Sequence, residues 1–136
     1  MDFNLTEEQK QIKALVREFC QREVDQKRMM KILRKNDTAN TVEEIRANYP
    51  YDLVEKAHKA GLRTLGISTK YGGPGPDTDP NMTIAIAKEE EGYSAGLPDH
   101  LIIGPSHFHQ SMRRNPYVSE KEREFVFSLI LKGVSL

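Results

Sequence analysis

Three consecutive glutamates, Glu89, Glu90 and Glu91, form the densest group of acid–base side chains in the sequence. Two carboxylates whose surroundings separate their pKa values can serve as general acid and general base. Neighbouring residues on a helix, however, point about 100° apart, so these three side chains do not converge on one substrate atom. We therefore expect a solvated helix face or ion pairs with a neighbouring helix, and we assign no catalytic residue to this chain.

Histidines form a second group with possible chemistry. His100, His107 and His109 lie close together in the sequence, with Asp99 beside the first, and imidazole is a common metal ligand. On a helix His100 and His107 share a face, whereas His107 and His109 diverge. Because no further ligand follows at a recognisable spacing, the pattern predicts surface or pocket-lining histidines and no metal site.

The glycines at 72, 73 and 75 raise the question of a phosphate-binding loop. Such a loop has the spacing G-x-G-x-x-G between a buried strand and a helix, and it needs free backbone N–H donors. Prolines at 74, 76 and 80 remove donors from this stretch, and no strand pattern precedes it. The pattern favours a tight surface turn between helices.

A single cysteine, Cys20, lies on an apolar helical stripe and reads as a small core residue rather than a nucleophile. One cysteine cannot form an internal disulfide, so the chain does not need an oxidising compartment. The N-terminus has no signal-peptide pattern, and no apolar run approaches the length of a membrane span. A cytoplasmic location is therefore the default expectation.

The elements that must position these residues read as helices. Thr6 and Gln9 have the spacing of a capping box, and a helix follows to about residue 27, which Met29, Met30, Ile32 and Leu33 are expected to extend. Its apolar stripe recurs at three- and four-residue steps and consists of Ile12, Leu15, Val16, Phe19, Cys20 and Val24.

Further helices follow along the chain, and no run alternates as a strand does. We expect a short helix at 42–47 begun by Thr41, one from Pro50 to a stop at Gly61, and one begun by an Asp79 cap and Pro80. A fourth apolar segment covers 97–112, disturbed at 104–105. The last helix starts at a capping box of Ser119 and Glu122, ends at Gly133, and has one apolar side that consists of Phe125, Val126, Leu129 and Ile130. The fold class is all-α, a bundle of about five or six helices in one domain, 1–136.

Charge excludes two classes of main partner. The 136 residues hold 20 Lys and Arg against 20 Asp and Glu, a formal net charge of zero, and the mean hydropathy is −0.62. A balanced chain lacks the basic excess typical of proteins that bind nucleic acid or anionic membranes. We expect neither nucleic acid nor a membrane span.

Four motifs in order resemble the N-terminal helical domain of acyl-CoA dehydrogenases. They are FNLTEEQ at 3–9, the run from KAGL at 59–62 to YGGPG at 71–75, EEEGY at 89–93 and SEKEREF at 119–125. The sequence departs from the family's pattern at Ser68, where the family has proline, and in the stretch 29–48, which is longer and more polar than is usual.

The resemblance implies an FAD-dependent oxidoreductase of fatty acid metabolism that dehydrogenates an acyl-CoA between its α and β carbons. In that family the helical domain packs against a central β-domain and a C-terminal helical domain, usually in a homo-oligomer. Neither further domain is in this sequence, so we expect a fragment that is inactive alone and binds no FAD tightly, and we assign no cofactor-binding residue. We also expect exposed apolar patches at 97–112 or 125–130 that cause self-association.

The resemblance also places substrate-binding residues by position. Gly96, Leu97, His100 and Ile103 correspond to one wall of the acyl pocket. The polar Asp99 and His100 fit a substrate other than a plain straight-chain fatty acyl group; the alternative is that these two side chains face the further domains of the enzyme. The alternative, from a different functional class, is a stand-alone helical interaction module without redox activity.

Overall fold

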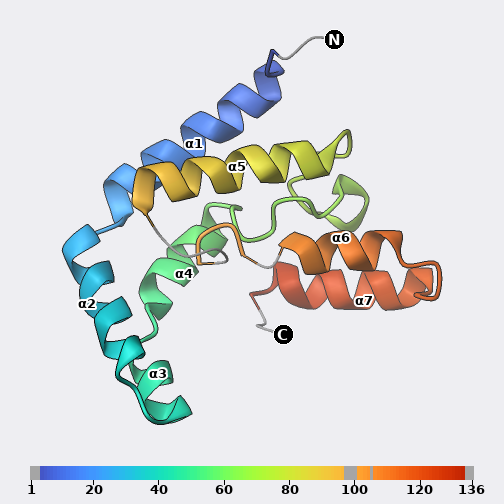
Figure 1. Cartoon of the computed structure of the whole chain (residues 1–136). Helices are drawn as coiled ribbons and strands as arrows, with labels where there is room; N and C mark the ends of the chain where they lie inside the picture. The colour runs from blue at the N-terminus through green and yellow to red at the C-terminus, as the bar shows by residue number, and fades with distance from the viewer. Residues whose placement is uncertain (1–3, 97–100, 105, 134–136) are drawn as a thin grey trace.

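Seven α-helices and one 3-10 turn make up the part of the chain that the computed structural model describes, residues 4–96, 101–104 and 106–133 (Figure 1). No strand occurs in these ranges, which confirms the all-α class. The helices are α1 (Glu7–Glu23), α2 (Gln26–Asp37), α3 (Val42–Asn48), α4 (Tyr51–Lys59), α5 (Pro80–Ala95), α6 (Ser106–Arg114) and α7 (Glu120–Leu131), and the 3-10 turn η1 is Thr69–Tyr71.

Three helix starts follow the predicted caps. Thr6, Thr41 and Ser119 each accept a hydrogen bond from the third helical N–H, and the residue at that third position bonds back to the cap. The expected cap at Asp79 is wrong. Its backbone is left-handed, with φ 46°, and its side chain makes no capping hydrogen bond, so α5 begins on Pro80 alone.

The first helix is shorter than the sequence indicated. Val24 is extended, and the carboxylate of Asp25 accepts hydrogen bonds from the backbone N–H groups of Lys27 and Arg28, at 3.0 and 3.3 Å. An aspartate that bonds to nearby backbone offers the chain an alternative to continuing a helix, and here it caps a new one. The methionines at 29 and 30 therefore belong to α2, and the expected extension of the first helix was wrong.

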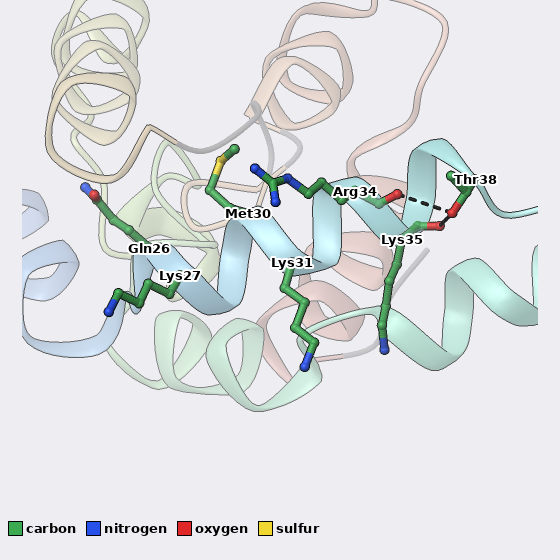
Figure 2. A pocket seen from close by; sticks show the side chains of 7 residues that line it. All are labelled: Gln26, Lys27, Met30, Lys31, Arg34, Lys35 and Thr38. Carbon is green, nitrogen blue, oxygen red and sulfur yellow. Dashed lines mark hydrogen bonds between the residues drawn. The ribbon is translucent and has the colours of Figure 1, made fainter.

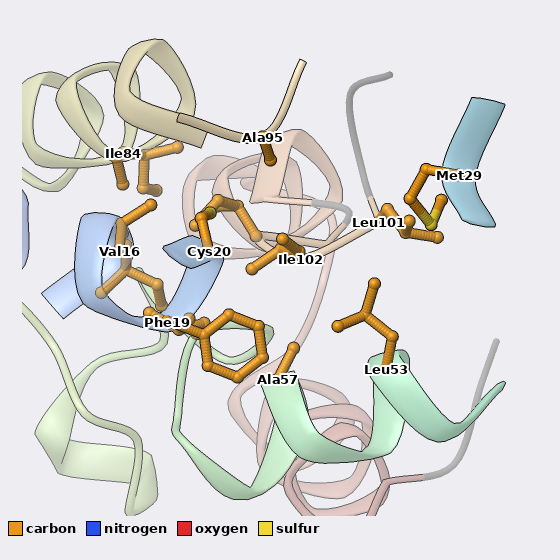
Figure 3. Close-up of a cluster of buried hydrophobic side chains, with 14 residues drawn as sticks. Val16, Phe19, Cys20, Met29, Leu53, Ala57, Ile84, Ala95, Leu101 and Ile102 are labelled. Carbon is orange, nitrogen blue, oxygen red and sulfur yellow. The ribbon is translucent and has the colours of Figure 1, made fainter. Parts of the chain in front are cut away.

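The core lies where α1, α4, α5 and the segment 101–103 meet (Figures 1 and 3). α1 and α5 lie side by side, and Phe19 of α1 points toward Ala57 of α4 in the centre of the cluster. Cys20 is buried among these side chains, as predicted, and burial raises the pKa of its thiol to about 12. Such a thiol stays protonated and unreactive near neutral pH.

α6 and α7 lie side by side at the other end of the molecule (Figure 1). Phe127 is the buried residue of α7, and its ring packs against that of Tyr71 in a tilted arrangement, with the ring centroids 4.9 Å apart. The predicted apolar side of this helix was therefore partly wrong, since Phe125 is 64% exposed. None of the helices in the described ranges is both long and apolar enough to cross a bilayer.

Candidate functional site

The candidate site is the segment 96–104, which leads from α5 toward α6. α5 ends because Gly96 adopts the left-handed conformation, with φ 60°, and its N–H donates to Gly92 O at 3.1 Å. Glycine carries no steric penalty in this conformation, which is why helices often end on it. A Cβ at position 96 would meet nothing within 4 Å, so the backbone conformation, not crowding, favours glycine there.

Two hydrogen bonds anchor the far end of this segment. The backbone N–H of Ile102 donates to the carboxylate of Glu91 at 2.9 Å, and the guanidinium of Arg63 donates to Leu101 O at 2.6 Å. Ile102 and Ile103 are fully buried in the core. A backbone held by charged side chains and by buried apolar groups has little freedom to move.

The structure places two of the four predicted pocket residues. Gly96 is exposed at the end of α5, and Ile103 is fully buried in the core, without surface that a ligand could touch in this conformation. Leu97 and His100 lie outside the described residues. The structure thus places Gly96 at the end of α5 and Ile103 in the anchored stretch 101–103, and their contact with a substrate stays a prediction.

Two of the three glutamates at 89–91 are bound within the fold, and Glu90 is bound to the neighbouring helix α1. Glu90 is 2% exposed, and Arg17 of α1 donates to both its carboxylate oxygens, at 2.8 and 3.2 Å. Ser94 adds a third hydrogen bond at 2.5 Å. The bond from Arg17 lowers the pKa of Glu90. Pairing with a neighbouring helix is thus confirmed for Glu90, whereas a solvated face is found only at Glu89, because Glu90 and Glu91 are both buried.

The glycine-rich stretch is a tight hairpin whose donors are used inside the chain. The N–H of Gly75 donates to Ile67 O at 2.9 Å, that of Gly73 to Ser68 O at 3.1 Å, and that of Gly66 to Gly75 O at 2.8 Å. The carboxylate of Asp77 accepts from the hydroxyl of Ser68 at 2.6 Å. The predicted surface turn is confirmed. Its N–H groups do not form a cradle that would fit a phosphate group.

The histidine prediction was wrong for His109. This side chain is fully buried, and its Nδ1 lies 3.4 Å from Leu65 O. The His109 side chain points inward because α6 begins at Ser106, which places position 109 on the side of the helix that faces Leu65, in the segment after α4. His100 and the side chain of His107 lie outside the described part. Within that part, no three His, Cys, Asp or Glu side chains are grouped so that they could hold a metal ion.

Sequence reasoning did not identify the residues that anchor this site. Arg63 and Glu91 hold the stretch 101–103 over separations of 38 and 11 residues, and Arg17 holds Glu90 of α5 over 73 residues. The sequence carries no local signal for these partners, because each bond joins residues of different elements. Such contacts become visible only when the helices are packed.

Comparisons with known proteins assign this arrangement to a family. Residues 6–103, which run from the cap of α1 to the end of the anchored segment, match the acyl-CoA dehydrogenase N-terminal domain. The short-chain-specific acyl-CoA dehydrogenase of Clostridium acetobutylicum is 26% identical over 129 residues, which are 95% of this chain and 30% of that protein. No solved structure matches. The chain belongs to the acyl-CoA dehydrogenase N-terminal domain family.

Proposed function

We propose that this chain serves as the helical N-terminal module of an FAD-dependent oxidoreductase that dehydrogenates an acyl-CoA thioester. The observation that carries the proposal is the family match over 6–103, which includes α1 to α5 and the anchored segment. The chain spans about a third of the curated relative's length, 30%. The remaining two domains of such an enzyme would supply most of the active site.

The role proposed for this chain is one wall of the acyl pocket, formed by Gly96, Leu97, His100 and Ile103. Gly96 supports the proposal because it ends α5 and turns the chain into the segment. Ile103 is buried in this conformation, so it holds the wall in place, and its contact with the acyl chain stays a prediction. Glu91 and Arg63 act as positioning residues, because they bind the backbone of this wall.

The catalytic base and the flavin site belong to the other domains in this proposal. Removal of the α-proton needs a carboxylate within hydrogen-bond reach of the substrate. Glu90 is held by Arg17, and Glu91 accepts from Ile102 N–H, so both are engaged within the fold. The hairpin at 66–75 does not fit the phosphates of FAD, because its N–H groups donate internally. FAD in the complete enzyme would accept the hydride from the substrate.

Association with further domains and further copies is part of the proposal. Phe125 on α7 and Tyr117 before it are 64% and 94% exposed, which supports the predicted contact surface at 125–130. Large exposed apolar side chains in a domain of this family suit contact with a neighbouring domain or subunit. Sedimentation of the purified chain should show concentration-dependent self-association that Phe125→Ser weakens, and a strictly monomeric chain would contradict this part.

Calorimetry on the purified chain tests whether this chain alone binds FAD or an acyl-CoA. We expect neither FAD nor a short-chain acyl-CoA to bind at micromolar concentration, because a single wall cannot enclose a ligand. Small-molecule sites bury about 70–90% of the ligand's surface. Stoichiometric binding of flavin at micromolar concentration would show that the cofactor site lies in this chain and would contradict the proposal.

A further inference from the structure

The outer face of α2 carries a concentration of positive charge. Figure 2 shows two parallel rows of side chains along this helix, one of Gln26, Met30 and Arg34, and the other of Lys27, Lys31 and Lys35. Between and around the rows lies a shallow, open groove of about 680 Å³. We call this surface the α2 groove. It faces solvent, while Met29 on the same helix is buried in the core.

The charges of the α2 groove are not neutralised by the fold. Among residues 4–96, 101–104 and 106–133, no ion pair involves the three lysines of the groove or Arg34. Arg28, on the same helix but outside the groove, is held by both oxygens of Asp52 at 2.8 and 2.5 Å. α2 holds five Lys or Arg and one Asp, a net charge of +4 in a chain whose total is zero.

Helix stability explains only part of this pattern, because Arg34 and Lys35 lie in the last turn, where the helix dipole favours positive charge. Lys27 lies in the first turn, where the helix dipole disfavours positive charge, and no acidic residue lies in that turn. Lys27, Lys31 and Lys35 follow one another at four-residue spacing, at which like charges repel. Lys27 and Lys31 thus weaken the helix that carries them, without the compensation that the last turn gives to Arg34 and Lys35. A bound anionic partner would remove both penalties.

We propose that the α2 groove binds an acidic amphipathic helix of a partner protein. Four residues of helix rise about 6 Å, so a partner helix with glutamates at four-residue spacing repeats its charges at the same interval as the lysine row. Ridges formed by residues four apart pack into the groove between such rows on a neighbouring helix. Met30, 51% exposed between the cations, offers an apolar contact to a leucine of that helix.

Other anionic partners fit the α2 groove less well. A bilayer surface selects helices with several large apolar side chains on the buried face, whereas this groove has Met30 alone. Sites for single-stranded nucleic acid combine basic side chains with aromatic rings on which the bases stack, and no aromatic residue lines the groove. A single phosphate is too small to contact all three lysines.

Binding of a synthetic peptide tests the proposal. The probe is a labelled helical peptide with glutamates at four-residue spacing beside a row of leucines, titrated with the 136-residue chain in a fluorescence anisotropy assay. We expect binding that weakens as salt rises and that weakens by about tenfold in K31E/K35E. The matched control, K121E/K132E, makes the same change in net charge on the exposed surface of α7 and its end, and should bind within about twofold of the parent chain.

Three results would overturn the proposal. One is equal binding by a peptide of the same composition with scrambled order, because the spacing of charges would then be irrelevant. Another is unchanged binding by K31E/K35E, with circular dichroism showing that the variant is as helical as the parent. The third is stronger, Lys31-dependent binding to phosphatidylserine vesicles than to the peptide. None of these measurements involves an acyl-CoA, so their outcome is separate from that of the proposed function.

Discussion

Replacement of Gly73 by alanine is expected to disrupt the hairpin that precedes α5. A Cβ at this position would lie 2.3 Å from the carbonyl oxygen of Ile67 and 2.6 Å from its Cβ. Ile67 is fully buried, and the same carbonyl oxygen accepts the N–H of Gly75. The clash is therefore with backbone in the middle of the hairpin, and it can be relieved only if the two arms separate.

The expected cost follows from the hydrogen bonds that such a separation breaks. The arms are joined by the bonds from Gly66, Gly73 and Gly75 described above, at 2.8, 3.1 and 2.9 Å. At about 1 kcal/mol of net stability each, losing two or three of them costs about 2–3 kcal/mol. For a chain of this length, about 4 °C in Tm corresponds to 1 kcal/mol, so Gly73→Ala should lower the Tm by about 8–12 °C.

Thermal unfolding followed by circular dichroism measures this change, and a second glycine provides the control. Gly92 lies inside α5, and a Cβ there would meet nothing within 4 Å. Gly92→Ala should therefore raise the free energy of unfolding by about 0.5–1 kcal/mol, because alanine is the better helix former. A Tm for Gly73→Ala within about 2 °C of the parent chain would show that a Cβ at this position does not clash with the backbone of Ile67.

The remaining predictions concern two buried titratable groups and the wall of the candidate site. The pKa of Glu90 is lowered by Arg17, so its ionised form stabilises the fold above the usual value of 4.5, and this stabilisation is lost as the pH falls through the lowered value. Between about pH 5 and pH 3, the free energy of unfolding measured in urea should therefore fall less for Glu90→Gln than for the parent chain. An identical fall would show that ionised Glu90 does not stabilise the fold. Cys20, with a pKa of about 12, should react with iodoacetamide near pH 8 far more slowly in the folded chain than in urea, and equal rates would show that it is accessible. Ile102→Ala should lower the free energy of unfolding by about 2–5 kcal/mol, because Ile102 is fully buried, and urea unfolding within about 1 kcal/mol of the parent chain would contradict its place in the core.

Local interactions explain what the sequence could predict of the fold. The caps at Thr6, Thr41 and Ser119 are bonds between residues three apart, so their spacing alone indicates them. The stop at Gly61 is equally local, because its positive φ of 78° is a conformation that favours glycine. Asp25 shows the limit of such patterns, since an aspartate inside an apolar repeat can lie on a polar face or start a new helix.

Burial and partners could not be predicted in the same way. Phe125 and Phe127 are both plausible core residues by pattern, and only the packing of α7 against Tyr71 decides that Phe127 is buried. Glu90 differs from its neighbour Glu89 because Arg17, 73 residues away, faces it. The α2 groove was also missed, because a net charge of zero for the whole chain conceals a helix of net charge +4.

A hybrid enzyme tests whether this chain builds a wall of the acyl pocket. This chain would replace the equivalent N-terminal segment of the Clostridium acetobutylicum short-chain-specific relative, and the visible absorbance of flavin in the purified hybrid would be followed as a short-chain acyl-CoA is added. We expect a hybrid that holds flavin and is bleached by the acyl-CoA, whereas the relative without its N-terminal segment is not bleached. A folded, flavin-containing hybrid that stays fully oxidised in the presence of acyl-CoA would contradict the claim that this chain builds a wall of the acyl pocket.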